Sequence, residues 1–123
     1  MIKVADVERV LQSFVTGTPD VQGSALVSPD GLPLVSVLPG GMDEERTSAM
    51  SAAMLSLGER IGRELSRGTI ERLFVEGDKG FAILVSCGAD AVFLVLASSE
   101  AKQGLLFLSI KRAIEEITPL LAG

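Results

Sequence analysis

Few side chains of this chain have the chemistry that a catalytic or metal site needs. The sequence has no His and a single Cys, Cys87. A cysteine nucleophile needs a neighbouring base or cation to form the thiolate, and no His exists to serve as that base. We therefore interpret Cys87 as a small structural residue near the end of a strand. A lone Cys also excludes an intramolecular disulfide and a zinc site with several Cys or His ligands. We expect no catalytic residue, no metal and no cofactor.

Two short segments resemble parts of binding sites. Residues 77–80 contain two Gly and a Lys, like half of a phosphate-binding loop. They lie between two expected strands, where no helix completes an anion site, so a hairpin turn is the better interpretation. Residues 43–45 are Asp, Glu and Glu, which could bind a hard cation. Acidic residues are favoured in the first turn of any helix by its dipole, and we interpret this cluster as a helix start.

The composition is that of a folded protein. The chain has 123 residues, 47% of them hydrophobic and 22% charged, which suits one domain spanning residues 1–123. Its net charge is −5 and its pI about 4.7. Such a chain, with scattered Lys and Arg, is a poor binder of nucleic acid or of an anionic membrane. We find neither a secretory signal nor an apolar run of the roughly 18 to 20 residues that span a bilayer, and we expect a cytoplasmic location.

Apolar spacing predicts three helices and five strands in the order α-β-β-α-β-β-β-α. The expected helices cover residues 3–15, 43–66 and 102–118, and the expected strands cover residues 22–28, 33–38, 69–76, 81–86 and 91–97. Pro119 is expected to end the last helix and Gly68 to cap the middle one. Residues 91–97 are almost wholly apolar, which predicts a strand in the middle of the sheet. The fold class is therefore α/β, an α+β sandwich with one five-stranded sheet covered by helices on both faces.

The middle helix carries two distinct sets of side chains. Large apolar residues recur every three or four positions: Met50, Met54, Leu57, Ile61 and Leu65. The first four of these are expected to pack on the sheet. Small residues are dense beside them: Ser48, Ala49, Ser51, Ala52, Ala53 and Ser56. This small-residue side is either an exposed surface rich in helix formers or a contact with a second copy of the chain. Gly58 and Gly62 add a small-residue spacing of four, which is weakly informative outside membranes.

In order and spacing, three features resemble the Roadblock/LC7 family over residues 4–121. The first is the hairpin of residues 21–34, with VQGSALVS followed by DGLPL. The second is the small-residue pattern of the middle helix, and the third is the strand with Leu94, Val95 and Leu96 followed by Gly104. The family includes prokaryotic regulators of gliding-motility GTPases and eukaryotic dynein and lysosomal scaffold light chains.

The resemblance implies a profilin-like Roadblock architecture. Its sheet is expected to be mixed or antiparallel, with the middle helix on one face and the terminal helices on the other. Two copies are expected to join through their middle helices and the strand at residues 69–76, which gives a continuous ten-stranded sheet. The candidate dimer-interface residues are Ala49, Ala52, Ala53, Ser56, Ile70, Arg72 and Phe74. Pairing with a paralogue instead of a second copy stays open.

The resemblance also implies a non-catalytic protein that binds a Ras-like small GTPase. Relatives that stimulate GTP hydrolysis reshape the active site of the GTPase and donate no arginine finger, so there is no catalytic residue to transfer. Arg60, Arg63 and Arg67 are candidate partner-binding residues, although solvated charges at a helix end are the simpler interpretation. The alternatives are a scaffold dimer without effect on nucleotide turnover, and a ligand sensor, which would need an apolar pocket with convergent polar groups.

Overall fold

The structure is a computed structural model that describes residues 2–122. The predicted order of three helices and five strands is confirmed. The elements are α1 (Val4–Gly17), β1 (Val21–Val27), β2 (Pro33–Val37), α2 (Glu44–Glu64), β3 (Arg72–Gly77), β4 (Gly80–Ser86), β5 (Val92–Ala97) and α3 (Gln103–Ala122). None of the helices described is both long and apolar enough to cross a membrane.

The five strands form one sheet in the order β2-β1-β5-β4-β3, and every neighbouring pair is antiparallel. The sheet is therefore antiparallel and not mixed. β5 lies at its centre, as its apolar sequence predicts. The first hairpin closes as expected, because Ser28 N–H donates to Leu32 O at 2.9 Å and Gly31 N–H donates to Ser28 O at 3.0 Å. Gly31 has a φ of 91°, which Gly adopts without steric cost.

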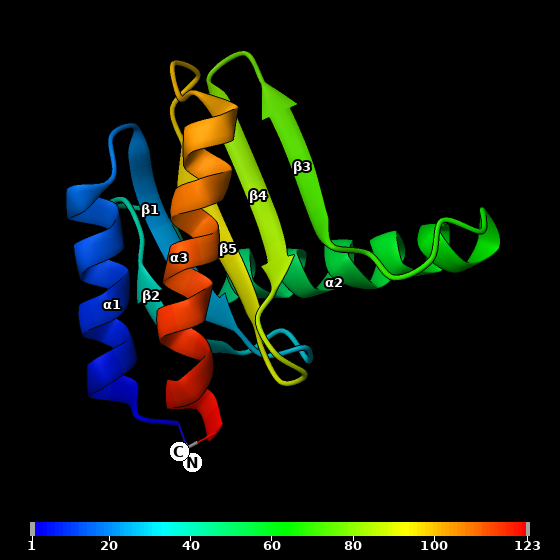
Figure 1. Ribbon diagram of the computed structural model, residues 1–123, viewed down its shortest axis with the longest axis horizontal. Coiled ribbons are helices and arrows are strands. Elements are labelled where there is room, and N and C mark those ends of the chain that lie inside the picture. The colour runs from blue at the N-terminus through cyan, green and yellow to red at the C-terminus, as the bar shows by residue number, and fades with distance from the viewer. Residues whose placement is uncertain (1, 123) are drawn as a thin grey trace.

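The sheet is covered on both faces, which confirms the expected layers. Figure 1 shows α1 and α3 side by side on one face and α2 on the other. Successive side chains of β5 alternate between the two cores: Phe93 and Val95 face α1 and α3, whereas Val92 and Leu94 face α2. The larger core lies under the terminal helices. In the smaller core, Leu55 is the one buried apolar side chain that comes from α2.

The last helix does not end at Pro119, as predicted, but continues to Ala122. Proline removes one backbone donor, and this loss is tolerated close to the end of a helix, where few backbone bonds remain to be broken. The free carbonyl of Leu120 accepts a hydrogen bond from Lys3 N–H at 3.2 Å. The two ends of the described chain therefore stabilise each other.

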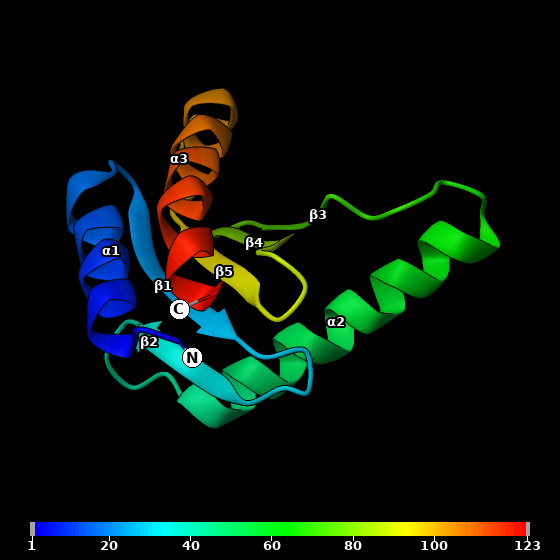
Figure 2. The ribbon, with the colours of Figure 1, turned by 60° about the horizontal axis from the view of Figure 1, so that its bottom comes forward.

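The end of α2 also differs from its prediction. The helix ends at Glu64, and the left-handed residue that follows it is Ser66, with a φ of 56°. Gly68 does not cap the helix directly, although it has a φ of 84° and donates its N–H to Gly62 O at 3.2 Å. β3 begins at Arg72 and not at residue 69, because residues 65–71 run back beside α2 and have no strand partner there (Figure 2).

The C-terminal half of α2 extends past the β3 edge of the sheet, as both views show (Figures 1 and 2). The 21 residues of α2 make a helix about 31 Å long. Five strands span only about 19 Å between the outer strand axes. Part of α2 therefore lies over no strand of its own sheet.

Candidate protein interface

The acidic residues before α2 begin the helix. Asp43 is the N-cap, and its Oδ1 accepts a hydrogen bond from Arg46 N–H at 3.0 Å. Glu44 and Glu45 follow in the first turn, where the helix dipole favours them. Across residues 2–122, no group of three or more His, Cys, Asp or Glu side chains is arranged to hold a metal ion.

The side of α2 that faces the sheet consists mainly of small residues. The prediction that its large apolar stripe packs there is wrong except for Met54, which packs against the core under α2. The buried residues of α2 are Ser48, Ser51, Leu55, Gly58 and Gly62. The two serine hydroxyls can be buried because each donates to the carbonyl four residues earlier, at 2.8 Å in both cases. Small side chains then let the helix lie close to the strands. Periodicity finds an apolar stripe but does not identify the surface that it contacts.

The large apolar stripe of α2 is exposed instead. Met50 and Leu57 are each 59% exposed, Ile61 is 45% exposed and Leu65 is 62% exposed, while Met54 is half-buried. At about 100° per residue, the stripe lies on the flank of α2, roughly a quarter turn from its sheet-facing side. An isolated exposed Leu is normal, but a continuous row of four marks an interaction surface.

The sheet next to this stripe is also incompletely covered. A groove of about 290 Å³ lies beside the N-terminal half of α2 and is almost wholly apolar. Its walls are Met42, Thr47, Met50, Ser51 and Met54, and its floor is Ala82 and Leu84 of β4 with Leu94 and Leu96 of β5. We call the exposed stripe of α2 and this groove together the apolar surface. It combines a ridge and a bare sheet face in one continuous area.

The small residues predicted at a dimer interface lie on the opposite flank of α2. A Cβ placed on Gly31 would lie 3.3 Å from Ala49 Cα and 3.5 Å from Ala52 Cβ, so these two alanines are next to the first hairpin of the same chain. Ala53 and Ser56 are exposed. Their place at an interface stays a prediction, but the apolar surface lies elsewhere.

The two glycines of α2 contact their own chain and do not form a small-residue helix contact. A Cβ on Gly58 would lie 2.6 Å from Leu73 Cδ2, and one on Gly62 would lie 2.6 Å from Gly68 O. The returning segment and β3 therefore approach the helix closely at both positions. Ile70 packs here, next to Gly62, and does not lie on the strand edge.

β3 is one of the two edge strands of the sheet, and its side chains alternate between the two faces. Phe74 points towards α3, where its ring centroid lies 5.0 Å from that of Phe81 and 5.9 Å from that of Phe107. The Arg72 guanidinium lies 4.4 Å from the centroid of the Phe107 ring, a cation–π distance. Leu73 points to the other face and packs in the core under α2.

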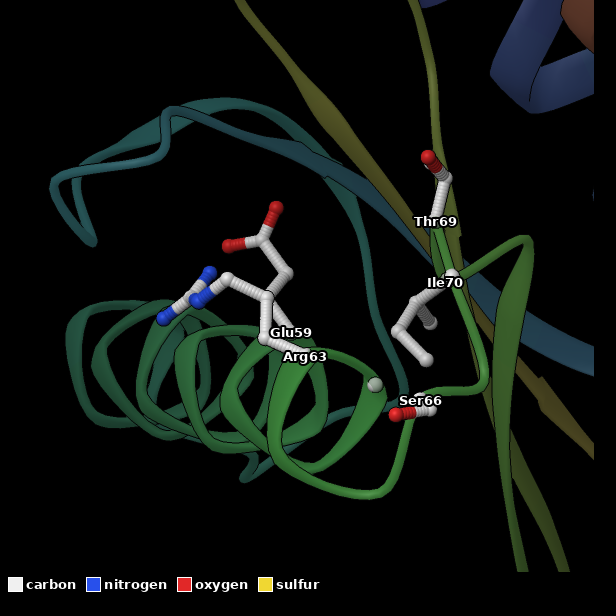
Figure 3. A pocket seen from close by; sticks show the side chains of 7 residues that line it. Glu59, Arg63, Ser66, Thr69 and Ile70 are labelled. Carbon is white, nitrogen blue, oxygen red and sulfur yellow. The ribbon is translucent and has the colours of Figure 1, made fainter.

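The three arginines near the end of α2 differ in their surroundings. Arg60 pairs with Glu64 at 3.2 Å, and Arg67 Nε donates to Leu65 O at 2.8 Å. Arg63 makes no ion pair within residues 2–122 and lines an open hollow of about 550 Å³ between α2 and the returning segment. Figure 3 shows Arg63 and Glu59 on the helix side of this hollow. Thr69 and Ile70 lie on the returning segment opposite them.

Cys87 is fully buried, which fits a structural role. Burial raises the pKa of its thiol, and a weak contact with Thr118 Oγ1 at 3.8 Å lowers it by a smaller amount. The thiolate, which is the reactive form, is therefore disfavoured in the folded chain.

We expect Cys87 to be labelled by iodoacetamide at pH 8 at least about 100-fold more slowly in the folded protein than in denaturant, because labelling requires local opening. The raised folded pKa also predicts a pH dependence of stability. Its contribution is fully present below the pKa of the unfolded thiol, about 8.5, and is lost as the pH rises through the folded value. A Ser99→Cys variant, whose added thiol is exposed, is the control and should label rapidly. Fast labelling of Cys87 in the native protein would contradict this prediction.

Known proteins resemble this chain in sequence or in fold. MJ1340, an uncharacterized protein of Methanocaldococcus jannaschii, is 35% identical over 111 residues, which are 90% of this chain and 96% of that protein. A Roadblock/LC7 domain from Streptomyces avermitilis superposes with a TM-score of 0.86 at 22% identity, over 93% of this chain and 96% of that one. MglB of Myxococcus xanthus superposes with a TM-score of 0.88 at 18% identity, over 96% of this chain and 89% of that one.

The family model for the Roadblock/LC7 domain matches residues 7–97. This range begins in α1 and ends with β5, so it includes the complete sheet and α2. The resemblance found in the sequence is thereby confirmed, and the chain belongs to the Roadblock/LC7 family.

Proposed function

We propose that this chain is a cytoplasmic, non-catalytic regulator that forms a homodimer, binds a Ras-like small GTPase and stimulates its hydrolysis of GTP. The observation that carries the proposal is the apolar surface of α2 and the adjoining sheet. Membership of the Roadblock/LC7 family supports the choice of a GTPase as the partner.

The shape of the apolar surface supports the proposal that a second copy of the chain binds to it. Gly58 still lies against Leu73 of β3, and the part of the chain that follows carries the exposed side chains of Ile61 and Leu65. The groove beside the N-terminal half of α2 is a sheet face with no helix over it. A two-fold axis at the β3 edge would lay each extended half-helix over the groove of the other copy. Each protomer would then cover what its partner leaves exposed.

The edge strands support the same axis. β2, one edge, begins at Pro33 and is followed by Pro39, and proline cannot donate a hydrogen bond to an added strand. β3, the other edge, contains no proline and has Leu73, Phe74 and Val75 at its centre. Pairing through β3 would satisfy its free backbone groups and give a ten-stranded sheet. The proposed interface thus keeps the strand of the sequence-based expectation but uses the other flank of α2.

A paired α2 leaves its polar flank available to the GTPase. This flank carries Arg63 and the hollow of Figure 3, with Glu59 beside it. We place the contact with the GTPase there because Arg63 and Glu59 line a hollow together with Thr69 and Ile70 of the returning segment. The adaptor needs no catalytic group of its own if it reorganises the active site of its partner.

The test is a nucleotide-dependent capture from a lysate of the source organism with the purified protein as bait. One capture contains GDP and the other a non-hydrolysable GTP analogue, and the bound proteins are identified by mass spectrometry. We expect a small GTPase that is enriched at least about tenfold with the analogue, since only unequal affinity for two states shifts an equilibrium between them. An Arg63→Ala bait is the matched control and should lose this enrichment while it remains dimeric.

A single-turnover GTPase assay with the purified partner then tests stimulation. Acceleration at saturating adaptor supports the regulator. A partner set that does not change with nucleotide, or that contains no GTPase, would overturn the proposal in favour of a scaffold dimer.

A further inference from the structure

The pairing of β3 with a second β3 is restricted by the alternation of its side chains. Leu73 lies in the core under α2, while Phe74 and Arg72 lie against Phe107 on the α3 face. By the same alternation Val75 points to the α2 face and Glu76 to the α3 face. A two-fold axis perpendicular to the sheet keeps each face on the same side in both copies. Directly opposed residues of antiparallel strands point to the same face of the sheet. The axis must therefore lie between one residue and its own copy in the partner, which we describe as passing through that residue, and not between residues of adjacent number.

We propose that the axis passes through Phe74, so that β3 pairs with itself with Phe74 opposite Phe74 and Arg72 opposite Glu76 of the partner subunit. This inference rests on the proposed homodimer and specifies its register. The partner is a second copy of this chain, because the sequence of β3 is complementary to itself about that one position.

Every pair in this register is chemically matched. The two-fold symmetry gives two copies of the pair between Arg72 and Glu76 of the partner subunit. Opposite charges directly across two strands attract each other. Leu73 faces Val75 of the partner subunit, which puts two aliphatic side chains together on the α2 face. Phe74 already belongs to an aromatic cluster with Phe81 and Phe107. Pairing about Phe74 joins the clusters of the two copies into one.

The neighbouring registers are poorly matched. An axis through Val75 sets the carboxylate of Glu76 opposite the Phe74 ring, where it loses hydration without gaining a partner. It would also bring Arg72 opposite Asp78 of the partner subunit, but Asp78 lies in the turn after Gly77 and not on the paired strand. An axis through Leu73 sets Glu76 opposite Ile70, which packs against Gly62 of its own helix and does not lie on the strand. Within the strand Arg72–Gly77, opposite charges face each other only when the axis passes through Phe74. The charge pair therefore selects both the register and a copy that carries the same two charges.

Charge reversal tests the pair. Arg72→Glu and Glu76→Arg each place two like-charge pairs at the axis, and each should raise the dimer Kd at least about tenfold in sedimentation equilibrium at low salt. The double variant Arg72→Glu/Glu76→Arg should return to within about threefold of the wild type. An equimolar mixture of the two single variants should form heterodimers, since both of its charge pairs are then opposite. Asp78→Lys, in the adjoining turn, is the control and should leave Kd within about threefold.

Disulfide cross-linking between introduced cysteines locates the axis directly. In a Cys87→Ala background, Phe74→Cys should form a symmetric disulfide on mild oxidation, whereas Leu73→Cys and Val75→Cys alone should not, because only opposed residues have Cα atoms close enough for a disulfide. If the loss of the Phe74 ring impairs folding, a mixture of Leu73→Cys and Val75→Cys subunits provides the same information. These subunits should cross-link only as heterodimers.

The outcomes separate this inference from the homodimer on which it rests. A wild-type chain that is monomeric at high micromolar concentration overturns the homodimer itself. The wild type could instead be dimeric while mixing the two charge variants restores no association, or while Leu73→Cys or Val75→Cys alone forms the disulfide. Either result retains the homodimer and overturns the Phe74 axis.

Discussion

Ile61→Glu should convert the proposed dimer into a folded monomer and raise its dissociation constant at least about 100-fold, which corresponds to about 2.7 kcal/mol. Ile61 is 45% exposed in the single chain, so the carboxylate of the variant remains hydrated in the monomer and the fold should be unaffected. In the dimer the same position would lie under the partner, and an unpaired charge buried there is strongly destabilising. Size-exclusion chromatography with light scattering measures the change, and circular dichroism confirms the fold.

Ser56→Glu is the matched control, because it introduces the same charge into the same helix on the other flank. Ser56 is exposed and belongs to the small-residue side that the sequence indicated as an interface. We expect this variant to remain dimeric. A dimeric Ile61→Glu together with a monomeric Ser56→Glu would restore the small-residue interface and contradict the apolar one.

The sheet could be predicted from the sequence because its pattern admits few arrangements. The apolar run that contains β5 needs cover on both faces, which places it at the sheet centre. Pro29 and Gly31 leave only a short turn between β1 and β2, so these strands become neighbours. Strand and helix types therefore follow from local chemistry. Their ends are less certain, because they depend on which neighbours are in reach, as at the start of β3.

The orientation of α2 could not be predicted, because periodicity identifies a stripe and not its partner. The rule that large apolar residues face the core fails for this stripe, which is mostly exposed on the flank of α2. Ser48 and Ser51 could have indicated the true sheet-facing side, since a serine can bond to the carbonyl four residues earlier and lie buried. The length of α2 was a second signal: a helix longer than the sheet is wide must extend past an edge.

The sequence of β3, the strand of the proposed interface, holds a further signal. The family resemblance alone makes Arg72 and Phe74 candidate interface residues, and it neither assigns them a face nor includes Glu76. Because side chains alternate along β3, one known contact assigns each of them to a face of the sheet. Phe74 lies against Phe107 on the α3 face, so Arg72 and Glu76 share that face, whereas Leu73 and Val75 lie on the α2 face. Ile70 was included because the strand was expected to begin at residue 69. The structure places Ile70 on the returning segment instead.

Gly80→Ala should destabilise the chain by about 3 kcal/mol or more and lower its melting temperature by about 10 °C. Gly80 has a φ of 144°, and a Cβ there would lie 2.4 Å from the backbone oxygen of Ala97. The first feature costs backbone strain, and the second forces β4 away from β5 at the sheet centre. Because Ala97 O belongs to the backbone, no side-chain rotation can relieve the contact.

Gly77→Ala is the matched control in the same hairpin, because a Cβ at Gly77 would meet only Gly80 O, at an ordinary 3.7 Å. We expect its melting temperature to stay within about 3 °C of the wild type, measured at equal protein concentration because the proposed dimerisation would contribute to apparent stability. Gly77 and Gly80 face each other across the turn, so a general intolerance of side chains there would affect both variants equally. Equal losses would thus contradict a cause specific to the approach of β4 and β5. A large loss of stability for Gly80→Ala alone would assign the cause to the close approach of Gly80 to the backbone oxygen of Ala97 in β5.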